Sequence, residues 1–148
     1  MSAKIFYDEL HKYAASHQKR GLPYLGEYQD EKNGYWLKGD NPRSSYYNHS
    51  GFADLIISDL VGLKPRDDDK LEVYPLIPEE QWDWFCLDKV NYRGRTITIR
   101  WDKTGTKYNQ GQGLYVYSDG KEIAKSKELK HIMVKLPLPL LTRDKMIQ

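Results

Sequence analysis

The chain has 148 residues, a length that suits one domain or two small parts that share a core. Its 23 Lys and Arg residues and 21 Asp and Glu residues give a formal net charge of +2, and both signs are mixed along the sequence. We therefore expect no nucleic-acid partner, because such proteins carry a basic patch or stripe.

Membrane and disulfide classes are also disfavoured. No apolar run approaches the roughly 18 residues that a bilayer-spanning helix needs, so we expect no membrane partner, and the compartment stays open. Cys86 is the single cysteine, which excludes an intrachain disulfide and a cysteine metal cluster. We expect it to be a small buried apolar residue.

The N-terminal part is predicted to be helical. Between Ser2 and Arg20 the apolar positions recur every three or four residues, with Ser2 as a candidate N-cap and Gly21 as a stop. A second helix is predicted from Ser50 to Val61, ended by Gly62. The long loop between them is uncommon unless it serves a site.

After Lys64 the apolar period changes to two, which indicates strands. Thr96 to Trp101 alternates strictly, and an Asp119-Gly120 turn predicts a hairpin. Further strands are expected over 71–76, 82–90 and 132–136, and residues 105–113 read as a loop. The fold class is thus α+β, with N-terminal helices followed by a small antiparallel β-sandwich.

Candidate chemistry is concentrated in the segment from Gly26 to Leu60. Glu27 could serve as a general acid or base, although an ordinary solvated loop glutamate is the commoner case. Flat amphipathic side chains that stack on sugar rings follow it, so we predict a sugar-binding rim with these candidate substrate-binding residues: Tyr28, Trp36, Tyr46, Tyr47 and His49.

Other chemistries find less support. The four histidines, His11, His17, His49 and His131, lack metal-ligand spacing, so we expect neither a metal nor a cofactor. Trp82, Trp84 and Trp101 leave open a stand-alone carbohydrate-binding β-sandwich module, if they form an exposed strip rather than core. A protein-interaction sandwich without a ligand is a third alternative.

The segment beginning GEYQDEKNGYW resembles the C-terminal end of large glycoside hydrolases with an (α/α)6 six-hairpin barrel, similar to mannosylglycerate-hydrolase-like and trehalase-like glucosidases. The resemblance covers about residues 5–135. Glu27, Tyr28 and Gly34 match the opening of the motif, residues 46–50 its aromatic patch and Phe52 to Leu60 its helix.

This resemblance implies an inverting glycosidase in which Glu27 is the general base. Residues 1–63 would be the last part of the barrel and residues 64–148 a β-sandwich cap. Inversion needs a second carboxyl group about 6.5–9.5 Å away, and the family's acid has no counterpart here. The implied partners are a carbohydrate and the remainder of the barrel, and we expect the isolated chain to be inactive.

Overall fold

The computed structural model describes residues 2–37, 41–47, 49 and 51–136. The chain divides into two compact units, Met1–Leu55 and Ile56–Gln148. Among the described residues, no helix is long and apolar enough to cross a bilayer. Asn48, Ser50 at the start of the second predicted helix, and residues 137–148 lie outside the described residues.

The first unit begins with helix α1, Ala3–Ala15. The Ser2 side chain caps it and accepts a hydrogen bond from the Ile5 backbone N–H at 3.3 Å, as the sequence predicts. At the other end the Ser16 hydroxyl donates to the Tyr13 carbonyl at 2.5 Å. The helix therefore ends earlier than Arg20.

A short hairpin follows the helix, where the sequence analysis extended it. Strands β1, Gln18–Lys19, and β2, Leu22–Pro23, pair antiparallel around Arg20 and Gly21. Both turn residues have positive φ, 54° and 78°, which is the backbone signature of a type I′ turn. Helical periodicity in the sequence does not reveal such a turn, because a glycine after a periodic stretch usually marks only a helix end.

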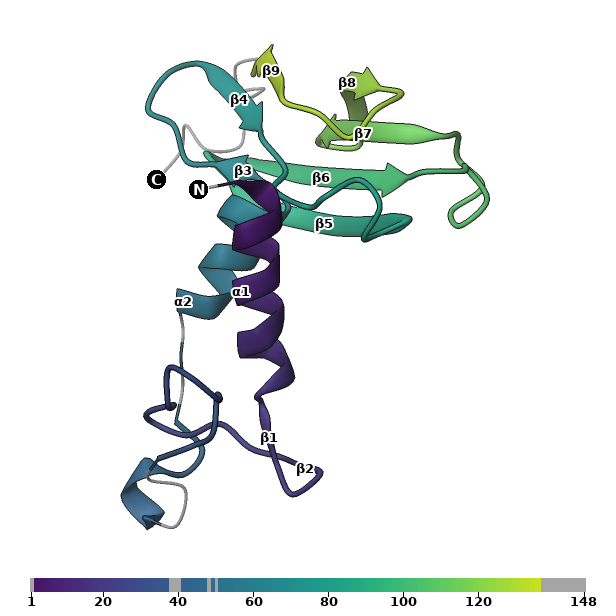
Figure 1. The fold of residues 1–148 in the computed structure, drawn as a ribbon. Helices are drawn as coiled ribbons and strands as arrows, with labels where there is room; N and C mark the ends of the chain where they lie inside the picture. Colours follow the sequence, from purple (N-terminus) through teal and green to yellow (C-terminus); the bar gives the residue numbers. More distant parts are fainter. Residues whose placement is uncertain (1, 38–40, 48, 50, 137–148) are drawn as a thin grey trace, which may run out of the picture. The chain divides into compact units, whose positions relative to one another are not determined.

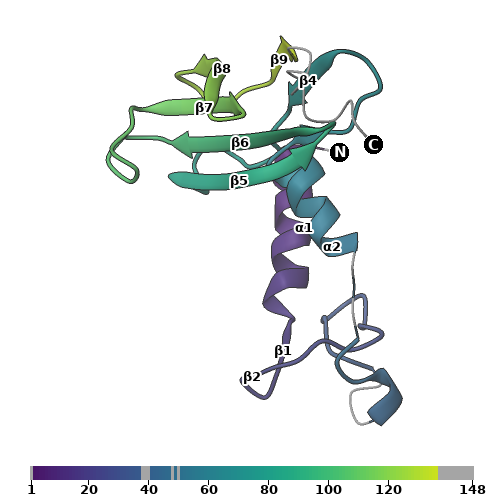
Figure 2. The ribbon, with the colours of Figure 1, turned by 180° about the vertical axis from the view of Figure 1, so that it is seen from behind.

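The second predicted helix is confirmed in place but has two parts. It starts as α2, Gly51–Asp54, which lies beside α1 in both ribbon views (Figure 1, Figure 2), and it continues as a π-helix, Leu55–Leu60. The Val61 N–H bonds to the Ile56 carbonyl, a five-residue step. Gly62 then turns the chain with φ 88°, where a Cβ atom would lie 2.2 Å from the Tyr74 carbonyl.

The second unit contains two antiparallel sheets (Figure 1). The larger has the order β5-β6-β7-β8, and the smaller has the order β3-β4-β9. Their bounds are β3 Leu63–Lys64, β4 Lys70–Val73, β5 Trp84–Tyr92, β6 Arg95–Asp102, β7 Gly113–Ser118, β8 Lys121–Ser126 and β9 Ile132–Lys135. The predicted strands and the loop before β7 are therefore confirmed, and β3 is new.

The core of this unit follows the predicted alternation. On β6, Ile97, Ile99 and Trp101 are buried, and they pair across β7 with Ser118, Val116 and Leu114. Leu71 and Val73 of the smaller sheet are also fully buried. Two antiparallel sheets that bury their inward residues make this a small β-sandwich.

One burial prediction is wrong. Cys86 is exposed, because Phe85 occupies the inward position of β5 and its neighbour must face outward. β5 is also an edge strand of its sheet, so nothing in that sheet lies beyond it.

The described residues are thus α+β with antiparallel sheets, as predicted at that level. A barrel is not present in the described part of the chain, which has two α-helices. The predicted domain limits, 1–63 and 64–148, stay a prediction, although the compact units meet slightly earlier, at Leu55.

Candidate functional site

The first unit gathers aromatic side chains around a contact between α1 and the segment before α2. The Tyr13 hydroxyl and the His49 Nδ1 atom form a hydrogen bond, and their rings stack with centroids 5.8 Å apart. Phe52 of α2 packs its ring against Tyr13 at 5.2 Å. These contacts hold the loop between the helices against the end of α1.

Trp36 is the second fixed point of the loop. Its indole Nε1 atom donates to the Ser16 carbonyl at 2.8 Å, and its ring meets Tyr24 at 5.8 Å and His49 at 6.4 Å. Gly26 permits this arrangement, because a Cβ atom there would lie 2.7 Å from the Trp36 ring. The predicted residues Trp36 and His49 are therefore neighbours in space.

The predicted tyrosines differ in their surroundings. Tyr46 is 81% exposed and lies 6.0 Å from the Tyr24 ring, whereas Tyr47 lies 6.0 Å from His49. Tyr28 is 45% exposed, and its backbone carbonyl accepts a hydrogen bond from Leu37. The exposed rings remain accessible to a partner, which the sugar-binding prediction requires.

Glu27 lies directly after Gly26 and is half-buried. Before Glu27, Gly26 bridges to Ser45 and Leu25 accepts the Tyr47 amide at 2.8 Å. After it, the Tyr28 carbonyl accepts the Leu37 amide at 3.1 Å, so the backbone on both sides of Glu27 is held. Glu27 does not line either of the two hollows described below. Its predicted role as general base thus stays a prediction.

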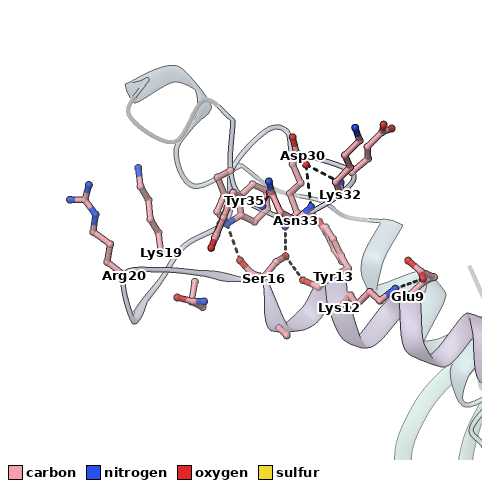
Figure 3. Close-up of a pocket in the computed structure, with 16 residues that line it drawn as sticks. Glu9, Lys12, Tyr13, Ser16, Lys19, Arg20, Asp30, Lys32, Asn33 and Tyr35 are labelled. Carbon is pink, nitrogen blue, oxygen red and sulfur yellow. Dashed lines mark hydrogen bonds and ion pairs between the residues drawn. The ribbon is translucent and has the colours of Figure 1, made fainter.

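A hollow of about 940 Å³ lies beside the end of α1 (Figure 3). Its lining includes Trp36, Tyr13 and Tyr35 together with Lys19, Arg20 and Lys32 from the hairpin and the loop. The Asp30 carboxylate accepts the Lys32 and Asn33 backbone N–H groups at 2.9 and 3.1 Å, which shapes the loop. Aromatic faces and hydrogen-bonding groups together are the lining that a sugar needs.

A second, more open hollow of about 430 Å³ is lined by His17, Tyr24, Tyr46 and Tyr47, with Pro23 and Leu25. The His17 ring lies 4.7 Å from Tyr13 and 5.1 Å from Phe52. Burial, and then the nearby His49, lower the pKa of His17, while burial raises the pKa of the Tyr13 hydroxyl. Both groups are therefore held neutral near pH 7.

His17, Tyr13 and Tyr24 belong to the site but were absent from the predicted site residues. Tyr13 fits the helical apolar stripe and so reads as core, and His17 lies in a polar stretch. The i,i+4 spacing of Tyr13 and His17 on a helix end, followed by Tyr24, was the available signal.

The tryptophans of the second unit do not form one exposed strip. Trp101 is 1% exposed and donates through Nε1 to the Trp82 carbonyl at 3.0 Å, whereas Trp84 is 49% exposed. Trp84 and Trp101 are on opposite faces of the sheet, since Trp84 pairs with Asp102 and Trp101 with Phe85. This weakens the binding-module alternative in the form that relied on these three rings.

A family model and a solved structure are similar to parts of this chain. Residues 63–124 match the model of the glycosyl hydrolase family 65, C-terminal domain. This stretch of the chain is similar to a glycoside hydrolase C-terminal region. That confirms the family resemblance at this level, and the matched range falls on β3 to β8 of the second unit.

A solved structure named "Sialidase" is also similar to the chain. It is 49% identical, with a TM-score of 0.85, and the match covers 90% of this chain and 12% of that chain. Residues 63–124 and the aromatic unit before them thus both fall largely within the match. The chain spans about one-eighth of the length of that relative.

Proposed function

We infer that this chain is the C-terminal portion of an inverting glycoside hydrolase. The single observation that carries the proposal is the family 65 C-terminal match over residues 63–124, in a chain that resembles 12% of a much longer sialidase. The β-sandwich serves as a cap, and the first unit completes the wall of an (α/α)6 catalytic barrel supplied by the rest of the protein.

Glu27 is the general base in this proposal. It would take a proton from the water that attacks the anomeric carbon, while a carboxylic acid elsewhere in the barrel protonates the leaving group. The support is its place in the loop, directly after the backbone that Ser45 and Tyr47 hold. A base must be held in position, because its rate contribution depends on reach to the water.

The aromatic side chains would bind the carbohydrate. Tyr46 and Tyr28 offer exposed ring faces, and Trp36 offers a ring whose indole N–H is already satisfied by Ser16. His49 is positioned by Tyr13 and would donate or accept a hydrogen bond toward a sugar hydroxyl. Rings that stack on the apolar face of a sugar, with a few fixed polar groups, give orientation and specificity.

Complementation tests this function. The 148-residue chain alone should show negligible hydrolysis of aryl glycosides, and mixing or fusing it with the remainder of a barrel should restore turnover. The anomer released first, followed by NMR, should be inverted relative to the substrate. Retention of configuration would contradict the inverting mechanism, and Glu27-dependent turnover by the chain alone would contradict its assignment as a portion.

A further inference from the structure

We propose that the hollow beside α1 binds acidic sugar units, whose carboxylates are recognised separately by Arg20 on the hairpin and Lys32 on the facing loop. This inference rests on the proposed carbohydrate function and adds the substrate class. The hollow of about 940 Å³ is large enough for more than one sugar ring. It lies wholly within the first unit, lined by residues 9 to 36.

The backbone at Arg20 is the first reason. Arg20 has φ 54° at the tip of the β1–β2 hairpin, a conformation that favours Asn, Asp or Gly. The β7–β8 hairpin of the same chain uses Asp119 and Gly120 at the equivalent positions, with φ 51° and 77°. A long cationic side chain in this strained position points to a role that outweighs the conformational cost.

The turn between β5 and β6 also has an arginine at positive φ, and there the side chain has a hydrogen-bond partner. Arg93 has φ 50° before Gly94, and its Nη2 atom donates to the Asp67 carbonyl at 3.4 Å. The Arg20 guanidinium has no ion-pair or hydrogen-bond partner within the described part of the chain. Arg20 is therefore left available for a partner from outside.

The charge of the hollow favours an anion. Glu9 is paired with Lys12 at 2.6 Å, and the Asp30 carboxylate is occupied by two backbone N–H groups. Among the described residues, Lys32 has no side-chain partner, so Arg20 and Lys32 are the available cations, while Glu31 is a free acid. The balance is positive, and Lys19 adds a cation 5.5 Å from the Tyr24 ring.

The surfaces around these cations suit a sugar rather than a bare ion. Figure 3 shows Lys19 and Arg20 extending side by side from the hairpin, with Tyr35, Asn33 and Lys32 on the facing loop. Trp36 supplies a further ring in the same lining. A carboxylate would contact the arginine fork while the ring of the sugar lies against an aromatic face.

The test is isothermal titration of the 148-residue chain with two matched pairs of probes. Trigalacturonate is compared with its carboxyl-reduced counterpart, and sialyllactose with lactose, so that the two sources of a sugar carboxylate are distinguished. We expect at least one acidic probe to bind about tenfold more tightly than its neutral partner, as one charge-assisted hydrogen bond provides.

Four variants locate the effect. Arg20→Asn and Lys32→Gln should each lower the affinity ratio, and Glu31→Gln should increase it. Arg20→Asn should also keep or raise the melting temperature, because Asn tolerates positive φ, which separates lost binding from unfolding. Arg93→Asn is the matched control and should leave the ratio unchanged.

Equal affinity for acidic and neutral probes, no binding of either acidic probe, or an unchanged ratio in Arg20→Asn would each overturn the proposal. These outcomes leave the proposed function standing, since that depends on hydrolysis by the complemented barrel. If the complemented enzyme turned over without Glu27 but still preferred the acidic probes, the proposed function would be rejected and this binding site would be retained.

Discussion

The indole Nε1 atom of Trp36 donates a hydrogen bond to the Ser16 carbonyl at 2.8 Å, which joins the loop to the end of helix α1. The Ser16 hydroxyl accepts a second hydrogen bond from the Gln29 side chain. Gln29 and Trp36 face each other in an isolated antiparallel β-bridge. The loop that carries Glu27 is thus attached to the helix through both residues of this bridge. Its conformation depends on contacts that are specific to these side chains.

Replacement of Trp36 by Phe should therefore destabilise the first unit. The change removes the Ser16 hydrogen bond and part of the ring contact with Tyr24, a loss of about 1–3 kcal/mol. Hydrogen exchange of the peptides that span residues 15–36 should become faster. Trp84→Phe is the control, because Trp84 is half exposed and the change there should cost about 0.5 kcal/mol or less.

Replacement of Gly26 by Ala should disturb the same loop for a different reason. The new methyl group would lie 2.7 Å from the Trp36 ring and 3.0 Å from the Tyr24 ring, so both rings must move. We expect a loss of about 1–3 kcal/mol, as for other overpacked sites, measured by chemical denaturation. Gly51→Ala, which meets no atom within 4 Å, should leave stability unchanged or slightly higher, and equal losses at both positions would reject the packing argument.

The second unit should show a specific acid sensitivity at Asp102. Its side chain is fully buried, which disfavours the charge, but backbone N–H groups of Gly105 at 2.8 Å and Tyr108 at 2.9 Å, with others of the same loop, outweigh burial and lower its pKa. Because the folded-state pKa lies below the unfolded value near 4, the ionised group stabilises the fold above about pH 4.

Asp102→Asn should thus cost about 2 kcal/mol at pH 7, since the amide replaces one acceptor oxygen by a donor. The difference from the wild type should shrink as the pH falls below about 4 and the wild-type carboxylate takes up its proton. Chemical denaturation of both proteins at pH 7, 5 and 3 measures this difference in the free energy of unfolding. Asp83→Asn, an exposed ion pair with Lys103 at 3.4 Å, should show almost no difference at any of these values.

The sandwich was largely predictable because its sequence carries local signals. Ile97, Ile99 and Trp101 alternate with polar residues, and Asp119-Gly120 favours the turn that the structure adopts. The β3 strand was missed because Leu63–Lys64 is too short to show a period. The Arg20-Gly21 turn was missed because arginine is not a usual turn residue at positive φ.

The site was predictable only in part. Trp36, Tyr46, Tyr47 and His49 were named from their residue types, and the structure gathers them with Tyr24. The contact between Tyr13 and His49 joins residues 36 positions apart, and local sequence patterns do not predict a contact at that separation. Glu27 was chosen from its neighbours, and neighbours in sequence do not fix where a loop side chain points.

The most direct test of the central claim is the turnover of an activated aryl glycoside by the complemented barrel, compared for wild type and Glu27→Gln. The assignment of Glu27 as general base predicts a fall in kcat of about 10²–10⁴-fold with little change in KM. Glu80→Gln, at an exposed glutamate that lines neither hollow, serves as the matched control and should keep kcat unchanged. A Glu27→Gln enzyme with the wild-type kcat would contradict that assignment.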